Sequence, residues 1–266
     1  MSHFDSRIKD KRNSESMIAV VFLRDFGFSD QANLRNALRN NFPDCSADIS
    51  SNKDKDPLFV FFHRGFVCSV MCFEANAPMA KTDPAFVNAW FWPTAWDELS
   101  RHSAHIVVSV AAGDGARARA LTLQRILQSV LFASPSAIGV HYASSGTLLP
   151  AKLVSHILQE GDRPAPMLFL SCFFAREKDG SFPRPGIMAS TKGLTEFGLL
   201  EIEARGFTGS PAELHPFLLT VGASLLEQKM TLKDGDTLSI GSSEAVRVAL
   251  VRSILHDADV YGLYFQ

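Results

Sequence analysis

Residues 193–240 carry the clearest pattern of apolar and polar positions in the chain. Residues 197–203 end in an apolar/polar alternation, which is typical of a half-buried strand. Ser210, Pro211 and Glu213 together form a helix start with a capping box, and apolar residues then recur at spacings of three and four up to Leu226. Residues 193–240 therefore predict a strand followed by an amphipathic helix, and they contain no catalytic motif.

In the rest of the chain, turn residues separate further predicted strands and helices. Residues 233–236, Lys-Asp-Gly-Asp, predict a turn before a strand at 237–240. The apolar run at 17–23 is typical of a strand buried on both faces. Other strands are predicted at 45–49, 58–62, 66–73, 105–112, 137–142, 167–175, 245–250 and 260–265, and other helices after Ser29 and at 116–132 and 150–159.

This order of elements predicts the α+β class. We expect two or three helix-on-sheet layers, built as split β-α-β (ferredoxin-like) units in a mixed, largely antiparallel arrangement. A length of 266 residues is enough for one large domain or two smaller ones. We predict a flexible tail at 1–16, an N-terminal α+β sub-domain at 17–100 and a C-terminal α+β sub-domain at 101–266.

Composition narrows the class of protein. Apolar residues make up 46% of the chain and charged residues 20%, which is typical of a globular protein with a buried core. The net charge of −2 gives no general attraction to nucleic acid or anionic membranes. The polar N-terminus is unlike a signal peptide, so we expect a cytoplasmic protein with neither a nucleic-acid nor a membrane partner. The four cysteines are then expected to be reduced.

All three tryptophans, Trp90, Trp92 and Trp96, lie within seven positions. Aromatic clusters usually pack in cores, so these rings are expected to fill the gap between the two sub-domains. The alternative is a partner-binding anchor, because tryptophan is enriched at binding hot spots.

Acidic residues gather in the C-terminal part of the chain: Glu196, Glu201, Glu203, Asp234 and Asp236. The simpler interpretation is solvent-facing strand residues plus a turn. If the strands are neighbours, the same residues would form a carboxylate patch that meets a basic surface of a partner protein. Metal-dependent hydrolysis is a third interpretation, which needs convergent geometry.

Other motifs lack the pattern of a known site. Residues 111–116, Ala-Ala-Gly-Asp-Gly-Ala, have neither the third glycine of a dinucleotide site nor the Lys-Ser/Thr of a P-loop, and Asp114 there is expected to cap a helix. Cys68 and Cys72, with His63 nearby, do not have zinc-site spacing. We predict no catalytic, cofactor-binding or metal-binding residues.

Two segments, GLTEFGLLEIEARGF and LLEQKMTLKDGDTLSIG, resemble the C-terminal signature of a bacterial family catalogued as a domain of unknown function. The resemblance covers about the C-terminal two thirds of the chain. Some members of that family sit beside secreted toxins as immunity proteins, including in type VI secretion systems. The resemblance implies a protein without chemistry of its own that neutralises a cognate toxin by steric occlusion, a nuclease effector being the first expectation.

Two other classes of function stay open. One is a hydrolase that uses the acidic residues or a histidine, with an unknown substrate. The other is a structural or regulatory module that self-associates. The sequence leaves the oligomeric state open and slightly favours a monomer.

Overall fold

The computed structural model describes residues 16–25, 31–45, 49–51, 58–176, 186–240 and 244–265. It divides the chain into a first unit, Met1–Leu168, and a second unit, Phe169–Gln266. The division therefore falls after Leu168 and not at residue 100, because the strand that follows residue 100 pairs with strands that precede it. Of the predicted tail, only Ser16 lies among the described residues, and it begins the first strand.

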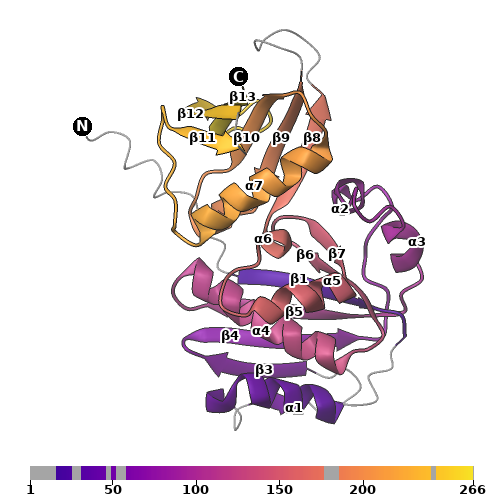
Figure 1. Ribbon diagram of the computed structural model, residues 1–266. Helices are drawn as coiled ribbons and strands as arrows, with labels where there is room; N and C mark the ends of the chain where they lie inside the picture. Colours follow the sequence, from indigo (N-terminus) through magenta and orange to yellow (C-terminus); the bar gives the residue numbers. More distant parts are fainter. Residues whose placement is uncertain are drawn as a thin grey trace. The chain divides into compact units, whose positions relative to one another are not determined.

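The first unit is built on a sheet with the strand order β2-β3-β4-β5-β1-β6-β7, in which neighbouring strands run antiparallel (Figure 1). Helices α1, α4 and α5 pack on one face of this sheet. The strands are β1 (Ser16–Leu23), β2 (Ser50–Ser51), β3 (Leu58–His63), β4 (Phe66–Phe73), β5 (Ala104–Ala112), β6 (Ala137–Tyr142) and β7 (Thr147–Pro150). The helices are α1 (Gln31–Asn41), η2 (Pro43–Cys45), α2 (Pro84–Asn88), α3 (Ala95–Leu99), α4 (Ala116–Ala133), α5 (Ala151–Ile157), η3 (Leu158–Glu160) and α6 (Pro166–Phe169), which ends in the second unit.

The period-two pattern of β4 shows how the sequence sets one face of the sheet. Its first, third, fifth and seventh residues are buried and the intervening ones are half-buried. The buried set faces α4, whose apolar residues Leu123, Ile126 and Leu127 are fully buried. Arg119 of α4 is buried although it is charged, because its guanidinium donates to the carbonyls of Ala112 and Gly113 in the preceding turn.

Helices α2 and α3 form a second, smaller core in the first unit. Trp92 and Leu99 pack with Phe22 of β1 and Leu148 of β7. His102 fastens this segment, since its Nε2 accepts from the amide of Ala77 at 2.6 Å and its Nδ1 lies 2.5 Å from the carbonyl oxygen of Leu99.

The second unit is built on a sheet with the order β11-β12-β13-β10-β9-β8, covered on one face by α7 (Figure 1). Strands β10 and β13 run parallel and the other neighbours antiparallel. The elements are β8 (Ser171–Arg176), β9 (Ile187–Lys192), η4 (Leu194–Phe197), β10 (Ile202–Phe207), α7 (Pro211–Leu226), β11 (Thr237–Ile240), β12 (Glu244–Arg252) and β13 (Asp259–Phe265). The α+β class with largely antiparallel sheets is confirmed.

Several boundaries differ from the predicted ones. The strand predicted at 197–203 begins at Ile202, because residues 194–197 form a helical turn that Gly198 ends with a φ of 75°. The strand predicted from residue 167 begins at Ser171, after α6. Cys45 lies in η2 and not in a strand. None of the described helices has the length and apolar character needed to cross a membrane.

Candidate functional site

The three tryptophans occupy different environments in residues 77–102, which contain α2 and α3 and are called the α2–α3 segment below. Trp92 is buried, its indole N–H donates to Glu98 at 3.0 Å, and its ring lies against Gly139. Trp96 is half-buried and meets the ring of Phe86 edge-on. Trp90 is 39% exposed. Of the predicted anchors, Trp90 is therefore the one whose ring is open to a partner.

Glu201 is a buried carboxylate that accepts hydrogen bonds from the end of β9 and from the connection between β9 and β10. Its oxygens accept hydrogen bonds from Thr191 Oγ1 and the Gly193 amide, both at 2.8 Å, and from the amide and hydroxyl of Thr195. The prediction that Glu201 faces solvent is wrong, because these donors lie inside the second unit.

Glu203 is fully buried on β10, on the sheet face opposite α7. Its Oε2 pairs with the Arg205 guanidinium at 2.5 Å, and Arg205 also lies over the ring of Tyr264. The prediction of a solvent-facing Glu203 is also wrong, because the loop between β12 and β13 covers it. Burial alone would raise the pKa of Glu203, but hydrogen bonds from Ser253, Arg205 and the Ile254 amide outweigh burial and hold it below its usual value.

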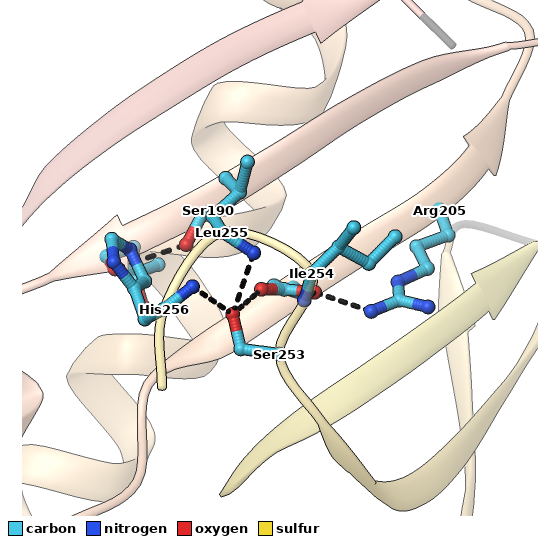
Figure 2. Close-up of polar contacts among 8 residues, drawn as sticks. Ser190, Arg205, Ser253, Ile254, Leu255 and His256 are labelled. Carbon is cyan, nitrogen blue, oxygen red and sulfur yellow. Dashed lines mark hydrogen bonds and ion pairs between the residues drawn. The ribbon is translucent and has the colours of Figure 1, made fainter. Parts of the chain in front are cut away.

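The covering loop, residues 253–258, is fixed to Glu203 by its first two residues. Figure 2 shows the loop residues Ser253 to His256, with the Ser253 hydroxyl between the chain of the loop and the strand beneath it. Ser253 Oγ donates to one carboxylate oxygen, and the Ile254 amide donates to the other at 3.4 Å. The same hydroxyl accepts from the amides of Leu255 and His256 at 3.0 and 2.9 Å. The Ser253 amide donates to Ala258 and closes the base of the loop. The backbone of residues 253–256 is therefore tied to one buried carboxylate.

The outer side of this loop is apolar at its centre and charged at its base. Ile254 and Leu255 are 56% and 48% exposed. Arg252, the last residue of β12, forms ion pairs with Asp257 in the loop and with Asp259, the first residue of β13. Residues 253–258 thus present two aliphatic side chains on a backbone with a defined conformation.

Asp234 and Asp236 shape the turn before β11. Asp234 Oδ1 accepts from the Leu250 amide at 2.9 Å, and Asp236 Oδ2 accepts from the Lys233 amide at 2.8 Å. The turn interpretation of residues 233–236 is confirmed. Glu201, Glu203, Asp234 and Asp236 are each bound to separate groups of the second unit, and the structure does not gather these four carboxylates into an open acidic surface.

Sequence analysis missed Ser253, Ile254 and Leu255. They lie between the strands predicted at 245–250 and 260–265, where the pattern indicates only a connecting loop. An Ile-Leu pair inside a short polar loop was the available signal, because apolar residues in such a loop either pack inward or meet a partner.

Cys45, His63 and Cys68 are buried in the first unit. Cys45 Sγ lies 3.4 Å from His63 Nδ1, and burial, helped by the charges of Arg64 and Arg125, lowers the pKa of His63. Burial, with the nearby Cys45, raises the pKa of Cys68 to about 12, so its thiol stays protonated at neutral pH. In the part of the chain that the structure describes, no three His, Cys, Asp or Glu side chains are grouped to hold a metal ion.

Comparison with known proteins places a family match on the second unit. Residues 190–260 match the family described as "Domain of unknown function (DUF4261)". No curated protein and no solved structure matches the chain. The matched residues include Glu203 and the whole loop 253–258.

Proposed function

We propose that this chain is an immunity protein that binds a cognate secreted toxin through loop 253–258 of the second unit. One observation supports this most directly: a buried carboxylate, Glu203, fixes a loop that exposes Ile254 and Leu255. A loop held in one conformation loses little conformational entropy on binding, so more of the interaction energy contributes to affinity.

The chemistry of the loop favours a protein partner. Two neighbouring aliphatic side chains fit an apolar pocket and offer nothing for catalysis on a small molecule. The charged residues around them suit the polar rim of an interface, since rim charges speed association and select the partner. Asp257, whose side chain is 96% exposed, would face a basic surface such as that of a nucleic-acid-cleaving toxin.

The resemblance to a family of unknown function, some members of which are immunity proteins, supports the same proposal, because its two segments lie in the second unit. A toxin of a type VI secretion system, a nuclease first of all, is the partner we infer, and steric occlusion of its active site is the mechanism. The chain would act in the cytoplasm, where such a toxin arrives, and would need no cofactor.

The test is co-expression with the protein encoded by the adjacent gene, followed by titration of the purified pair. We expect a stoichiometric complex, and we expect Ile254→Asp with Leu255→Asp to weaken binding about 100-fold, since two central contacts become charged. Phe132→Asp, at an exposed apolar residue of α4 in the first unit, is the matched control and should bind like the unmodified chain.

One result would contradict the immunity function, and another would contradict only the assignment of the contact to loop 253–258. If the pair does not associate at micromolar concentration, the immunity function is lost. If the pair associates but Trp90→Ala weakens it and the loop variant does not, the function stands and the contact surface lies in the α2–α3 segment.

A further inference from the structure

The sheet of the first unit has a second face that α1, α4 and α5 do not cover. Helices α2 and α3 pack on one end of it, over Phe22 and Val20 of β1. The remainder spans β3, β4, β5 and β1 in three rows of side chains that are neighbours across the strands. We call these ten residues the open sheet face: Phe62, Val67 and Ala111; Val60, Ser69, Ser109 and Ile18; Leu58, Met71 and Val107.

The open sheet face has the composition of a buried surface. It contains eight apolar residues, two serines and no Lys, Arg, Asp or Glu. Antiparallel sheets that face water on one side normally alternate apolar and polar residues. Here Ile18 and Phe62 are 37% and 63% exposed, and the other eight residues are half-buried. A contiguous apolar patch of this kind marks an interaction site.

The two polar residues of the face satisfy each other. Ser69 Oγ and Ser109 Oγ lie 2.7 Å apart on neighbouring strands β4 and β5. Burying a hydroxyl costs free energy when its hydrogen bond to water is not replaced. Because this hydrogen bond is already made within the sheet, the centre of the face can lose water at little cost.

We propose that two copies of this chain pair through the open sheet face, sheet on sheet. The face has no charge pattern that would select a different, charged partner, and a second copy offers a flat, uncharged surface of the same shape related by a two-fold axis. Four strands and three rows cover about 400 Å² in plan at the usual strand spacing and rise. Two such faces bury on the order of 800 Å² in plan, which is the size of a weak interface whose dimer forms only at high protein concentration.

This pairing departs from the monomer that the sequence slightly favoured. It involves the first unit and is independent of the proposed role of loop 253–258 in the second. The two proposals therefore fail separately: loss of toxin binding leaves the dimer intact, and loss of the dimer leaves the loop contact intact.

The first test is the molar mass in solution, by light scattering after gel filtration or by sedimentation, over a range of concentrations. We expect a dimer for the full chain at about 100 µM. Ile18→Lys with Phe62→Lys should give a monomer, because both add a charge to a surface that must lose water. Phe132→Lys, at an 81% exposed residue on the helix side, should stay dimeric. Circular dichroism checks that each variant is folded.

A second measurement asks what covers the face. The four native cysteines are buried, so a thiol introduced by Ile18→Cys can be followed by alkylation. The labelling rate at position 18 should fall at least tenfold as protein concentration rises through the dimer range, and the rate for Phe132→Cys should not change. A monomer at every concentration, a dimer that survives the double lysine variant, or protection at position 18 that does not depend on concentration would each overturn the proposal.

Discussion

Glu203 and Arg205 form a buried ion pair, and its energetic role follows from burial. Placing two charges away from water is costly, and the pair offsets that cost only while both members are present. Ser253 and the Ile254 amide supply the further hydrogen bonds that the carboxylate needs. Removing the carboxylate leaves the Arg205 charge with less compensation and releases the loop above it.

Glu203→Gln should therefore lower the free energy of unfolding of the second unit by about 3 kcal/mol at neutral pH, the range found when one partner of a buried pair is removed. Urea titration followed by circular dichroism measures this change. Glu213→Gln, at an exposed carboxylate, is the comparison and should cost less than half as much. An equal loss for both variants would show that the buried pair has no special role.

The pH dependence of the same variant has a defined sign. The pKa of Glu203 lies below its usual value of 4.5 in the folded protein, so the unfolded state binds more protons and stability rises with pH. The stabilisation by Glu203 is present above about pH 4.5 and is lost as pH falls through the lower, folded pKa. The difference in unfolding free energy between the unmodified chain and Glu203→Gln should shrink below that pH. A difference that stays constant from pH 7 to pH 3 would contradict this assignment.

The same residues show why the site could not be predicted from the sequence. In β10, Ile202 and Ala204 face the core under α7, and Glu203 and Arg205 alternate with them on the opposite face of the sheet. Their burial depends on loop 253–258, which lies about 50 positions further along the chain. A period-two pattern contains no information about such a distant cover, so solvent exposure was the natural but wrong expectation.

Among the elements, those with local signals were predictable. The capping box of Ser210 and Glu213 is present as predicted, and α7 spans Pro211–Leu226. The strand at 197–203 failed because Glu201 uses its oxygens to hold the turn at Gly193 and Thr195, which is a tertiary interaction. Short elements such as β7 have too few residues to show a period.

Helix α7 closely approaches Leu170, the residue before β8, at Gly222. A Cβ built there would overlap Leu170 Cδ1, so a larger side chain must displace that residue. Gly222→Val should lower the unfolding free energy of the second unit by about 1–3 kcal/mol through overpacking. Ala212→Val, at an exposed position of the same helix, bears only the helix-propensity cost of about 0.6 kcal/mol. Equal effects of the two would argue against tight packing at Gly222.

The α2–α3 segment can be followed by its own fluorescence, because the three tryptophans of the chain all lie at 90–96. His102→Leu leaves the Ala77 amide and the Leu99 carbonyl without their partner and should destabilise this segment by about 2 kcal/mol. The fluorescence transition should then come at lower urea than the circular dichroism transition. His156→Leu, at an exposed histidine, should leave both transitions unchanged. Coincident transitions in His102→Leu would show that α2 and α3 unfold together with the sheet.

At the scale of the whole molecule, we propose a different task for each unit. The second unit would present loop 253–258 to a protein partner, and the first unit would pair two copies through the open sheet face. Neither proposed task uses an ionisable side chain as an acid, a base or a nucleophile. Both depend on apolar side chains that the fold leaves exposed.

The claim on which the proposed function depends is that Glu203 holds loop 253–258 in one conformation. Amide hydrogen exchange of the purified chain tests it directly, because the amides of Ile254, Leu255 and His256 all donate to Glu203 or to Ser253. We predict slow exchange at these three amides in the unmodified chain and at least tenfold faster exchange in Glu203→Gln, with the amides of β10 and β13 still protected. Fast exchange at the three amides in the unmodified chain, or equal rates in both proteins, would contradict it.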